Sequence, residues 1–336
     1  MQNNLFYYAT KELSQDAFIC WLMSFARKNS KKDDGLRECA RDFIKQFTRD
    51  ESGAELWVTN IQRQYKSIDV LIEVNYKYLI LIEDKTHTDE HDDQLARYRT
   101  LLETDFPDRQ LFCVYWKNGF QSDMSSVIEN NYLPFGRNDI LSTLEKYVSR
   151  TDNQIFIDYY EYVKNMQKEV SLFRSIPIPQ WNWLQINGFY DYLKQNPGII
   201  GDSFKANYGY VANPSGGFFG MWFGNGTFKT IDDDRYELYL QMEFVEGHLR
   251  ICYKASAYEN ENKIDSSICN SLLGIYEGTN WINVAEKHNF NRPVKFGCGK
   301  TVTLGVFDAD PVSYDEAIEC IKESEQSFSE IIKELR

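Results

Sequence analysis

Three ionisable residues stand inside apolar segments of the chain, where a charge is costly unless it is paired or bound to a metal. Asp69 interrupts the segment SIDVLIEV, and Glu83 and Lys85 lie near the end of the segment YLILIEDK. Side chains alternate along a strand, so Glu83 and Lys85 share one face while Asp84 points to the other. The two segments therefore predict a small cluster of charges inside an otherwise buried sheet.

The turn between these segments predicts how they pair. The midpoint of positions 69 and 83 is residue 76, which lies inside the apparent turn at Asn75, Tyr76 and Lys77. A hairpin that pivots there places Asp69 directly opposite Glu83. Opposed Cβ atoms lie about 4.5 to 5.5 Å apart and diagonal ones about 7 to 8 Å apart, within reach of a lysine. Both carboxylates and the ammonium group of Lys85 should then converge on one point.

Such a cluster predicts cation binding. Two carboxylates about 4 Å apart repel by roughly 4 kcal/mol at an effective dielectric constant of about 20, so the site should take up a proton or a cation. Acidic oxygen ligands favour a hard cation, Mg²⁺ first and Mn²⁺ or Ca²⁺ next. With such a cation, water is activated and the charge of a phosphodiester is neutralised, while Lys85 orients the water or stabilises developing negative charge.

The flanking segments predict the elements that position the cluster. A first helix begins near Glu12 and a second follows a charged turn. The positions that recur at helical spacing are Leu13, Ala17, Cys20, Trp21 and Phe25 in the first, and Leu36, Ala40, Phe43, Ile44 and Phe47 in the second. Residues 55–65, 67–74 and 78–85 are rich in Val, Ile, Leu and Tyr and predict three strands.

A helix and a further strand follow the lysine. Residues 92–103 carry the apolar stripe Leu95, Tyr98 and Leu102, and Thr88 or Asp89 is the expected cap. Residues 110–117 form a nearly unbroken apolar run, as expected for a strand that is covered on both faces. The predicted order is helices, three strands, helix and strand.

This pattern resembles the PD-(D/E)XK nuclease superfamily, which has the restriction-endonuclease-like fold. The resemblance covers about residues 5–120 and rests on Asp69, on Glu83-Asp84-Lys85 and on the order of the elements. The proline of the motif is absent, because Ile68 precedes Asp69. Gln94 and Tyr98, spaced by four on the helix after the lysine, look like the Q-x-x-x-Y motif of the exonuclease-like branch.

The resemblance implies an α/β fold with an αβββαβ core, a mixed sheet flanked by helices, and a nuclease that cleaves DNA rather than RNA. It implies a Mg²⁺ cofactor, for which Mn²⁺ can substitute, and products with 5′-phosphate and 3′-hydroxyl ends. Glu12, or Asp16 one turn on, would complete the metal shell of Asp69 and Glu83, together with the main-chain carbonyl of Asp84. Gln94 and Tyr98 would position the substrate strand. Proteins of this build resemble prokaryotic defence or mobile-element nucleases.

The second half of the chain has a different texture. Two prolines in SIPIPQW mark a boundary at residues 175–181, which separates a nuclease-like domain over 1–175 from an α+β accessory or recognition domain over 176–336. Aromatic strands follow it, and Asn225-Gly226 predicts a hairpin turn. Helices are expected over 139–149, 152–172, 261–276 and 314–335.

Charge argues against a non-specific nucleic-acid coat protein. The 336 residues include 37 basic and 50 acidic ones, for a net charge of -13. Residues 1–175 hold 23 basic and 28 acidic side chains and the remainder 14 and 22, so a basic surface is expected on the first half. A phosphate-contacting rim and a plain solvated helix face are both compatible with Arg27, Lys28, Lys31, Lys32, Arg37, Arg41, Lys45 and Arg49.

Composition also bears on the compartment. The 43% hydrophobic and 26% charged residues are those of a soluble globular protein. No run of 18 or more apolar residues and no secretory signal is visible, so a cytoplasmic protein without a membrane segment is expected. The seven cysteines form no C-x-x-C pair and are expected to be reduced and buried.

Other interpretations stay open at this point. Asp69, Glu83 and Lys85 also fit a structural ion pair. His87 and His91 allow a zinc site, although no third ligand is placed by spacing. The whole chain fits a non-catalytic interaction module or an RNA-cleaving nuclease. A protein partner or a homodimer is a further alternative, as the source of the basic surface that binds DNA. The aromatic residues of the second half suit base stacking or a core: Trp181, Trp183, Tyr208, Tyr210, Phe218, Phe219, Trp222 and Phe223.

Overall fold

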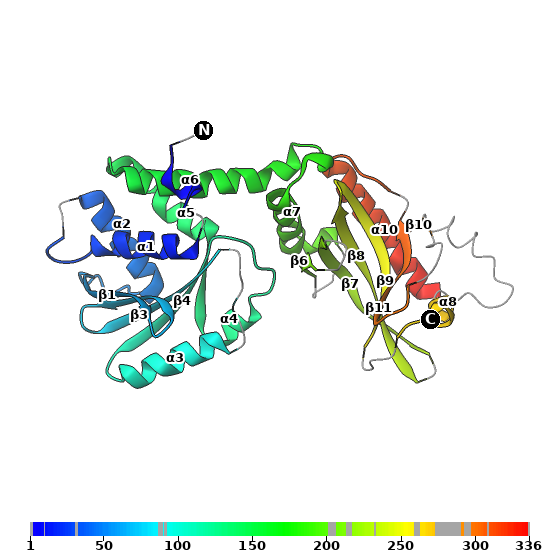
Figure 1. Cartoon of the computed structure of the whole chain (residues 1–336), viewed down its shortest axis with the longest axis horizontal. Helices are drawn as coiled ribbons and strands as arrows, with labels where there is room; N and C mark the ends of the chain where they lie inside the picture. The colour runs from blue at the N-terminus through cyan, green and yellow to red at the C-terminus, as the bar shows by residue number, and fades with distance from the viewer. Residues whose placement is uncertain are drawn as a thin grey trace. The chain divides into compact units, whose positions relative to one another are not determined.

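The computed structural model divides into two compact units, residues 1–168 and 169–336 (Figure 1). Each unit has its own sheet and core and is described by itself. The structure describes residues 3–9, 11–30, 33–86, 90, 93–200, 206–212, 217–231, 233–258, 263–272, 290–291, 297–307 and 309–334.

The first unit contains a five-stranded mixed sheet in the order β1-β2-β3-β4-β5. β1 (Val58–Tyr65), β2 (Ile68–Val74) and β3 (Tyr78–Lys85) are antiparallel, whereas β4 (Gln110–Lys117) and β5 (Tyr132–Gly136) run parallel to β3. All eight residues of β3 are buried, since this central strand is covered on both faces. This is the mixed α/β sheet that the sequence predicts.

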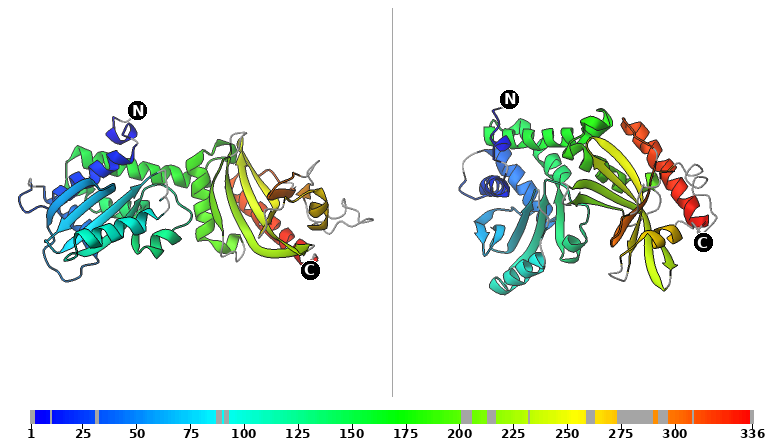
Figure 2. Two further views of the ribbon diagram at one scale, coloured as in Figure 1. Left: turned by 60° about the horizontal axis from the view of Figure 1, so that its bottom comes forward. Right: turned by 45° about the vertical axis from the view of Figure 1, so that its right-hand side comes forward.

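Helices cover both faces of this sheet (Figures 1 and 2). Ile80 and Ile82 point into a core shared with α1 (Glu12–Ser24), α2 (Asp34–Thr48), α5 (Arg137–Glu145) and α6 (Gln154–Ser171). Leu79 and Leu81 point into a second core shared with α3 (Gln94–Asp105) and α4 (Ser125–Glu129). Short 3-10 turns stand at Leu5–Tyr7 and Val148–Arg150. The two-faced burial explains the apolar character of the central strands.

The predicted face of α1 is wrong in the first half of the helix, although its start at Glu12 is confirmed and Cys20, Trp21 and Phe25 do contact the core. Leu13 is 52% exposed and Ala17 is also exposed. The buried residues of the helix are Gln15, Asp16, Phe18, Ile19, Leu22 and Met23. From Phe18 onward the helix is apolar nearly all round, so spacing alone cannot choose a face. Two polar residues on the buried face also pointed the prediction elsewhere. The predicted face of α2 is confirmed, as all its apolar positions are buried.

Sequence reasoning missed β5 and α4. The β5 segment YLPFG is short and carries Pro134, which opposes Tyr115 of β4. A proline lacks the N–H that a ladder needs, and it is tolerated here because β5 is an edge strand. Asp93 occupies the N-cap position of α3, while the predicted caps Thr88 and Asp89 lie outside the described residues.

The second unit is built on an antiparallel sheet in the order β10-β11-β9-β8-β7-β6. The strands are β6 (Asn207–Val211), β7 (Phe218–Ile231), β8 (Asp234–Val245), β9 (His248–Ala257), β10 (Phe290–Asn291) and β11 (Thr301–Phe307). The helices are α7 (Trp183–Gln195), α8 (Ser266–Leu272) and α10 (Tyr314–Glu334), with 3-10 turns at Leu172–Arg174, Ile178–Gln180 and Pro197–Ile199. β10 and β11 were not predicted, and the flanks of α8 lie partly outside the described residues.

Asn225-Gly226 does not form the predicted hairpin turn. β7 continues through it, with an irregularity in its pairing to β8 between Phe223 and Thr227. Gly224 adopts a φ of 65°, a conformation that glycine tolerates. The turn-forming dipeptide therefore occupies a bulge within a long strand, and the chain reverses only after Ile231.

Burial of the cysteines and aromatic residues follows the predictions only in part. All seven cysteines are free; Cys39, Cys113, Cys252 and Cys269 are buried, whereas Cys298 is exposed. Trp181, Tyr208 and Phe223 belong to the core, but Trp183 is 39% and Tyr210 58% exposed. Within the described ranges, no helix combines the length and apolarity needed to cross a bilayer.

Candidate active site

Asp69, Glu83 and Lys85 gather at the same end of β2 and β3. The register of the two strands pairs Val70 with Ile82, and one step further Asp69 faces Glu83, as the hairpin predicts. Lys85 Nζ lies 2.8 Å from Glu83 Oε1, and these two side chains are 10% and 1% exposed. Glu83 is reached from α3 through Gln94, whereas Asp69 lies near Lys85 and Glu12. The three groups therefore converge at the end of β3.

Main-chain and amide donors hold the carboxylate of Asp69. The backbone N–H of Asp84 donates to Asp69 Oδ2 at 2.9 Å, and Gln64 Nε2 donates to Asp69 Oδ1 at 3.2 Å. Gln64 has a φ of 57° near the end of β1, a left-handed conformation that is uncommon for a residue with a side chain. This backbone brings the amide of Gln64 over the edge of β2. Asp69 is thereby fixed to the end of β3.

The predicted helix pair Gln94 and Tyr98 also reaches this cluster. Gln94 Nε2 donates to Glu83 Oε1 at 2.8 Å and lies 3.2 Å from the hydroxyl oxygen of Tyr98. Tyr98 in turn donates to the main-chain carbonyl of Ser67 at 2.8 Å. The Q-x-x-x-Y pair therefore ties α3 to both strands that carry the acids.

Glu12 and Asp16 approach from the opposite face of the sheet. Glu12 Oε1 accepts a hydrogen bond of 2.8 Å from the backbone N–H of Thr86, directly beyond β3. Asp16, the alternative to Glu12 in the sequence analysis, is 1% exposed. It lies near Asp84, whose fully buried side chain points toward α1 as predicted. Acids therefore surround the end of β3 on both of its faces.

Burial and mutual repulsion raise the pKa values of these acids. Burial, followed by the charge of Asp69, raises the pKa of Glu83 to about 7. The same two causes raise the pKa of Asp16 to about 6. Burial also raises the pKa of Asp69, against the hydrogen bond from Asp84, and raises that of Asp84 well above its usual range. Such a site favours uptake of a proton or cation.

Lys85 stays charged in this environment. Burial lowers its pKa, but the carboxylates of Glu83, Asp69 and Glu12 outweigh burial and the net pKa is raised. The ammonium group of Lys85 thus faces several carboxylates and compensates part of their charge.

The donor set suits a hard divalent cation. Glu83 Oε1 is occupied by Lys85 and Gln94, whereas the buried Glu83 Oε2 has no hydrogen-bond partner in the described part of the chain. A cation between Asp69 and Glu83 would give that oxygen a partner and offset the repulsion. Among the described residues, no three acidic, His or Cys side chains are arranged around one point. Main-chain carbonyl and water oxygens, and the carboxylate of Glu12 after a change of its side-chain position, would have to complete the shell.

Three polar residues at the end of β3 were missed by sequence reasoning: Gln15, Gln64 and Lys117. Lys117 is 2% exposed and pairs with Lys85 in the parallel register of β3 and β4, so both lysines point to the same face. Its position at the end of the apolar run QLFCVYWK is the signal that was overlooked. Gln15 is likewise a polar residue on the buried face of an apolar helix.

Two other expectations receive no support as binding features. Arg37 pairs with Asp34 at 3.1 Å and Arg41 contacts Glu55, which favours a solvated face of α2 over a phosphate-binding rim. His87 and His91 lie outside the described residues.

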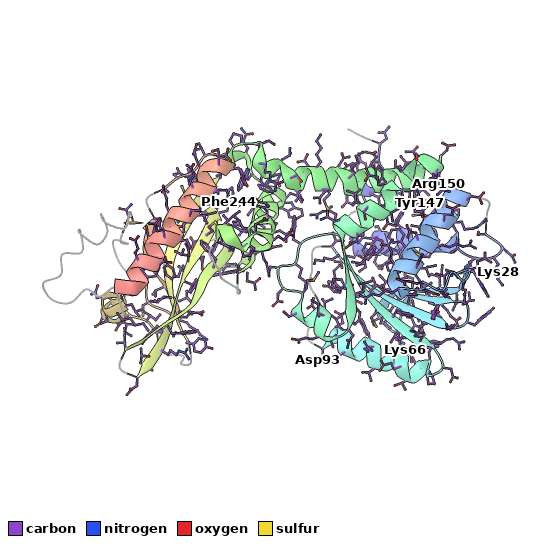
Figure 3. The ribbon with its side chains drawn as sticks, turned by 180° about the vertical axis from the view of Figure 1, so that it is seen from behind. Lys28, Lys66, Asp93, Tyr147, Arg150 and Phe244 are labelled. Carbon is purple, nitrogen blue, oxygen red and sulfur yellow. The ribbon has the colours of Figure 1, made fainter. Side chains whose placement is uncertain are left out.

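The turn between β1 and β2 carries Lys66 (Figure 3). This turn is tied to the end of α3, because Lys66 Nζ lies 2.6 Å from Asp105 Oδ2.

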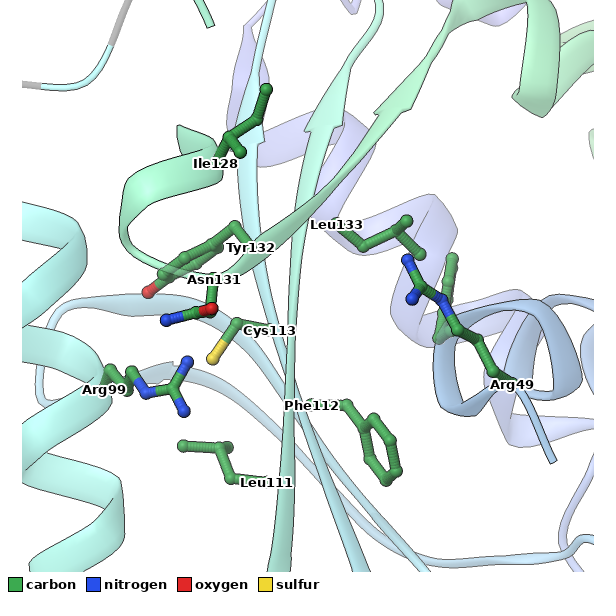
Figure 4. Close-up of a pocket in the computed structure, with 10 residues that line it drawn as sticks. Arg49, Arg99, Leu111, Phe112, Cys113, Ile128, Asn131, Tyr132 and Leu133 are labelled. Carbon is green, nitrogen blue, oxygen red and sulfur yellow. The ribbon is translucent and has the colours of Figure 1, made fainter. Parts of the chain in front are cut away.

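A separate hollow lies at the other end of β4 (Figure 4). It has a volume of about 470 Å³ and is lined by residues that include Arg49, Arg99, Phe112 and Tyr132. Phe112 pairs with Ile80, three positions before Glu83 on β3. None of the predicted catalytic or metal-binding residues lines this hollow. The chemistry and the pocket therefore belong to different ends of the sheet.

Comparison with known proteins agrees with the fold. A family model described as the PD-(D/E)XK nuclease superfamily matches residues 3–171, half of the chain. The protein belongs to this superfamily, and the match ends at the last residue of α6. No curated protein and no solved structure matches the chain significantly.

Proposed function

We propose that the protein is a metal-dependent nuclease that hydrolyses phosphodiester bonds, with DNA as its substrate. The observation that carries the proposal is the convergence of Asp69, Glu83 and Lys85 at one end of the β2–β3 hairpin, with Glu83 Oε2 buried and without a partner. A purely structural ion pair needs one acid for one lysine, and a second acid there lowers stability. The arrangement is better explained by a cation that the folded protein takes up.

Each side chain has a role in this proposal. Asp69 and Glu83 hold Mg²⁺, with the main-chain carbonyl of Asp84 and the carboxylate of Glu12 as further ligands. The cation supplies Lewis-acid chemistry, neutralising charge on the phosphodiester and activating water. Lys85 stabilises the negative charge that develops on the phosphate oxygens, because its ammonium group stays protonated.

Gln94 and Tyr98 orient the site from α3. Gln94 holds Glu83 through Oε1 and so leaves Oε2 directed to the cation. Tyr98 fixes the turn before β2 through the carbonyl of Ser67. With the substrate bound, Gln94 and Tyr98 position the substrate strand from α3 in this proposal.

The second domain, residues 176–336, is proposed to supply recognition of the substrate or of a protein partner. A net charge of -13 opposes tight binding of duplex DNA by the protein surface as a whole. A partner or a second copy of the chain would therefore contribute basic surface. A role in prokaryotic defence, in the cytoplasm, is proposed from the family resemblance.

Cleavage assays test the activity. Plasmid DNA and a structured RNA are incubated separately with the protein in Mg²⁺ or Mn²⁺, and in EDTA. We expect metal-dependent cleavage of DNA that Lys85→Ala lowers by at least a hundredfold. Lys77→Ala is the matched control, because Lys77 stands at the opposite end of the same hairpin. Cleavage of RNA alone would reassign the substrate.

Metal binding is tested independently of cleavage. Titration calorimetry with Mn²⁺ should give a binding isotherm for the wild-type protein and none for Asp69→Ala. Crystals soaked in Mn²⁺ should show anomalous density between Asp69 and Glu83. Matching isotherms for the two proteins, together with no Lys85-dependent cleavage, would favour a non-catalytic interaction module.

A further inference from the structure

Gln15 of α1 is buried directly behind the end of β3. Its side chain is 6% exposed, and it lies on the face of β3 opposite to Glu83 and Lys85. An amide has two donor hydrogens and one carbonyl acceptor, so burial requires several partners of matching kind. Gln15 finds these partners on three different elements of the first unit.

The donor side of the Gln15 amide faces β3. Nε2 donates to Asp84 Oδ1 and lies 3.4 Å from Thr86 Oγ1. Asp84 and Thr86 flank Lys85, and their side chains share one face because they are two residues apart. One amide group therefore holds both residues on either side of the lysine.

The acceptor side of the amide is held from elsewhere. Gln15 Oε1 accepts from the hydroxyl of Tyr159 at 2.8 Å and from Asn118 Nδ2 at 3.2 Å. Tyr159 belongs to α6 and Asn118 follows β4 directly. Two donors around Oε1 prevent the amide from turning its carbonyl toward Asp84, where two acceptors would repel each other. Tyr159 is further held by its ring, which stacks on Phe18 with centroids 3.7 Å apart.

The backbone of the same two residues holds the acids. The N–H of Asp84 donates to Asp69 Oδ2, and the N–H of Thr86 donates to Glu12 Oε1. A shift of the strand end would therefore move both carboxylates relative to Glu83. The side chains of Asp84 and Thr86 thus bind Gln15, and the main-chain N–H groups of the same residues bind Asp69 and Glu12.

We propose that Gln15 is a positioning residue of the active site, and that Tyr159 acts through it by fixing the orientation of its amide. Gln15 holds Asp84 and Thr86 in place and so sets where Asp69 and Glu12 stand relative to Glu83. The inference rests on the proposed function, because it concerns the geometry with which the acids hold a divalent cation. Partners that orient metal ligands typically change affinity by about 10- to 100-fold when removed.

The test is titration calorimetry with Mn²⁺ on the full chain, using Gln15→Leu, Tyr159→Phe and the double variant. Each single variant should weaken Mn²⁺ binding by about tenfold. The double variant should be no weaker than Gln15→Leu alone, since Tyr159 acts through Gln15. Tyr160→Phe is the matched control: it is the next residue of α6, 4% exposed, and its hydroxyl donates to Glu145 outside this network.

The outcomes separate this inference from the proposed function. Wild-type affinity in Gln15→Leu and Tyr159→Phe, with binding lost in Asp69→Ala, would overturn the positioning role alone. Equal weakening in Tyr160→Phe would also overturn it, as this would indicate a general loosening of α6. Absence of Mn²⁺ binding in the wild-type protein would overturn the proposed function, and the inference with it. Thermal unfolding in EDTA identifies any variant that fails to fold. If Gln15→Leu does not fold, the Mn²⁺ affinity of Tyr159→Phe tests the inference.

Discussion

The electrostatics of the site depend chiefly on Glu83. It is fully buried, shares Oε1 between Lys85 and Gln94, and leaves Oε2 without a partner in the described structure. Its pKa of about 7 means that the metal-free protein holds a proton there under mildly acidic conditions. In the proposed function, a proton and the cation would therefore compete for one buried oxygen, and lower pH would favour the proton.

The shift of Glu83 predicts a pH dependence of stability. The pKa rises from 4.5 to about 7 on folding, so the folded state binds more protons across that interval. The contribution to stability is complete below pH 4.5 and is lost as the pH rises through about 7. In EDTA, the free energy of unfolding should fall across this window by on the order of 2 to 3 kcal/mol from this group.

Urea denaturation in EDTA at pH 5 and pH 7.5 measures this effect. Glu83→Gln should show a smaller fall in unfolding free energy between the two values than the wild type. Glu103→Gln, which changes an exposed acid paired with Arg99, should keep the wild-type fall. An equal fall in wild type and Glu83→Gln would contradict the assignment of a raised pKa to Glu83.

Gln94 and Tyr98 allow a second prediction at this scale. Tyr98→Phe removes the hydrogen bond to the carbonyl of Ser67 but keeps the ring in the core, where Tyr98 is 5% exposed. We expect kcat for DNA cleavage to fall about tenfold while the protein stays folded, by analogy with other residues that orient a metal ligand. Steady-state kinetics in Mg²⁺ measure the fall. Tyr65→Phe, which changes an exposed hydroxyl bonded to Asp105, is the control. Wild-type kcat in Tyr98→Phe would exclude the role.

Most of the charged site was predictable from sequence because its signal is local. Asp69, Glu83 and Lys85 stand out as charges in apolar strands, and the hairpin midpoint alone predicts their register. Gln15 and Gln64 gave no such signal, because uncharged amides are common on helices and strand ends. Their roles depend on long-range neighbours, Tyr159 for one and Asp16 for the other. Such long-range contacts leave no periodic pattern in the sequence around these residues.

At the scale of elements, α1 shows where periodicity fails. Its apolar residues occur on more than one face, and the buried face is chosen by what the sheet and α6 offer. Polar Gln15 and Asp16 are buried there, Gln15 against Asp84 of β3 and Asp16 against Gln64 of β1. The strands were easier to predict, since their alternation and β-branched residues suffice, but β5 escaped because a proline interrupts a run of five residues.

A pair of leucine variants tests the observed face of α1. Leu22→Ala should lower the free energy of unfolding by about 2 to 5 kcal/mol, because a fully packed side chain leaves a cavity. Leu22 is 1% exposed. Leu13→Ala, on the face that spacing predicts and 52% exposed, should change it by less than about 0.5 kcal/mol. Urea denaturation of both variants measures the difference, and the reverse order would restore the predicted face.

Gly119 provides a test of how closely the loop after β4 packs on the site. A Cβ at this position would lie 1.8 Å from the carbonyl oxygen of Thr86, far inside van der Waals contact. Gly119→Ala should therefore displace the residue whose N–H holds Glu12, and weaken Mn²⁺ binding. Gly198→Ala is the control, because a Cβ at that position would meet no atom within 4 Å. Gly53→Ala is unsuitable, because the backbone of Gly53 has a φ of 72°. Unchanged Mn²⁺ affinity in Gly119→Ala would show that the close packing of Gly119 on Thr86 has no influence on metal binding.

At the scale of the whole molecule, the two units have separate sheets and separate cores. The acids, Lys85 and the helix α3 all belong to the first unit, and the family model covers that unit and the remainder of α6. From a change in texture the sequence predicts a boundary at residues 175–181, and it does not predict the strand order of the second unit. Strands β10 and β11 are far from β9 in sequence, and short or irregular segments of that kind carry little local signal.

Separate cores predict that a cation stabilises only one of them. In differential scanning calorimetry of the full chain, Mn²⁺ at a hundred times its dissociation constant should stabilise the first unit by about 2.7 kcal/mol and leave the second unchanged. Leu22→Ala should lower the transition that Mn²⁺ raises, whereas Leu240→Ala, in the core of the second unit, should lower the other. Asp69→Ala should remove the response to Mn²⁺. A single transition that both leucine variants lower and Mn²⁺ raises would show instead that the units unfold together, and that metal binding stabilises the molecule as a whole.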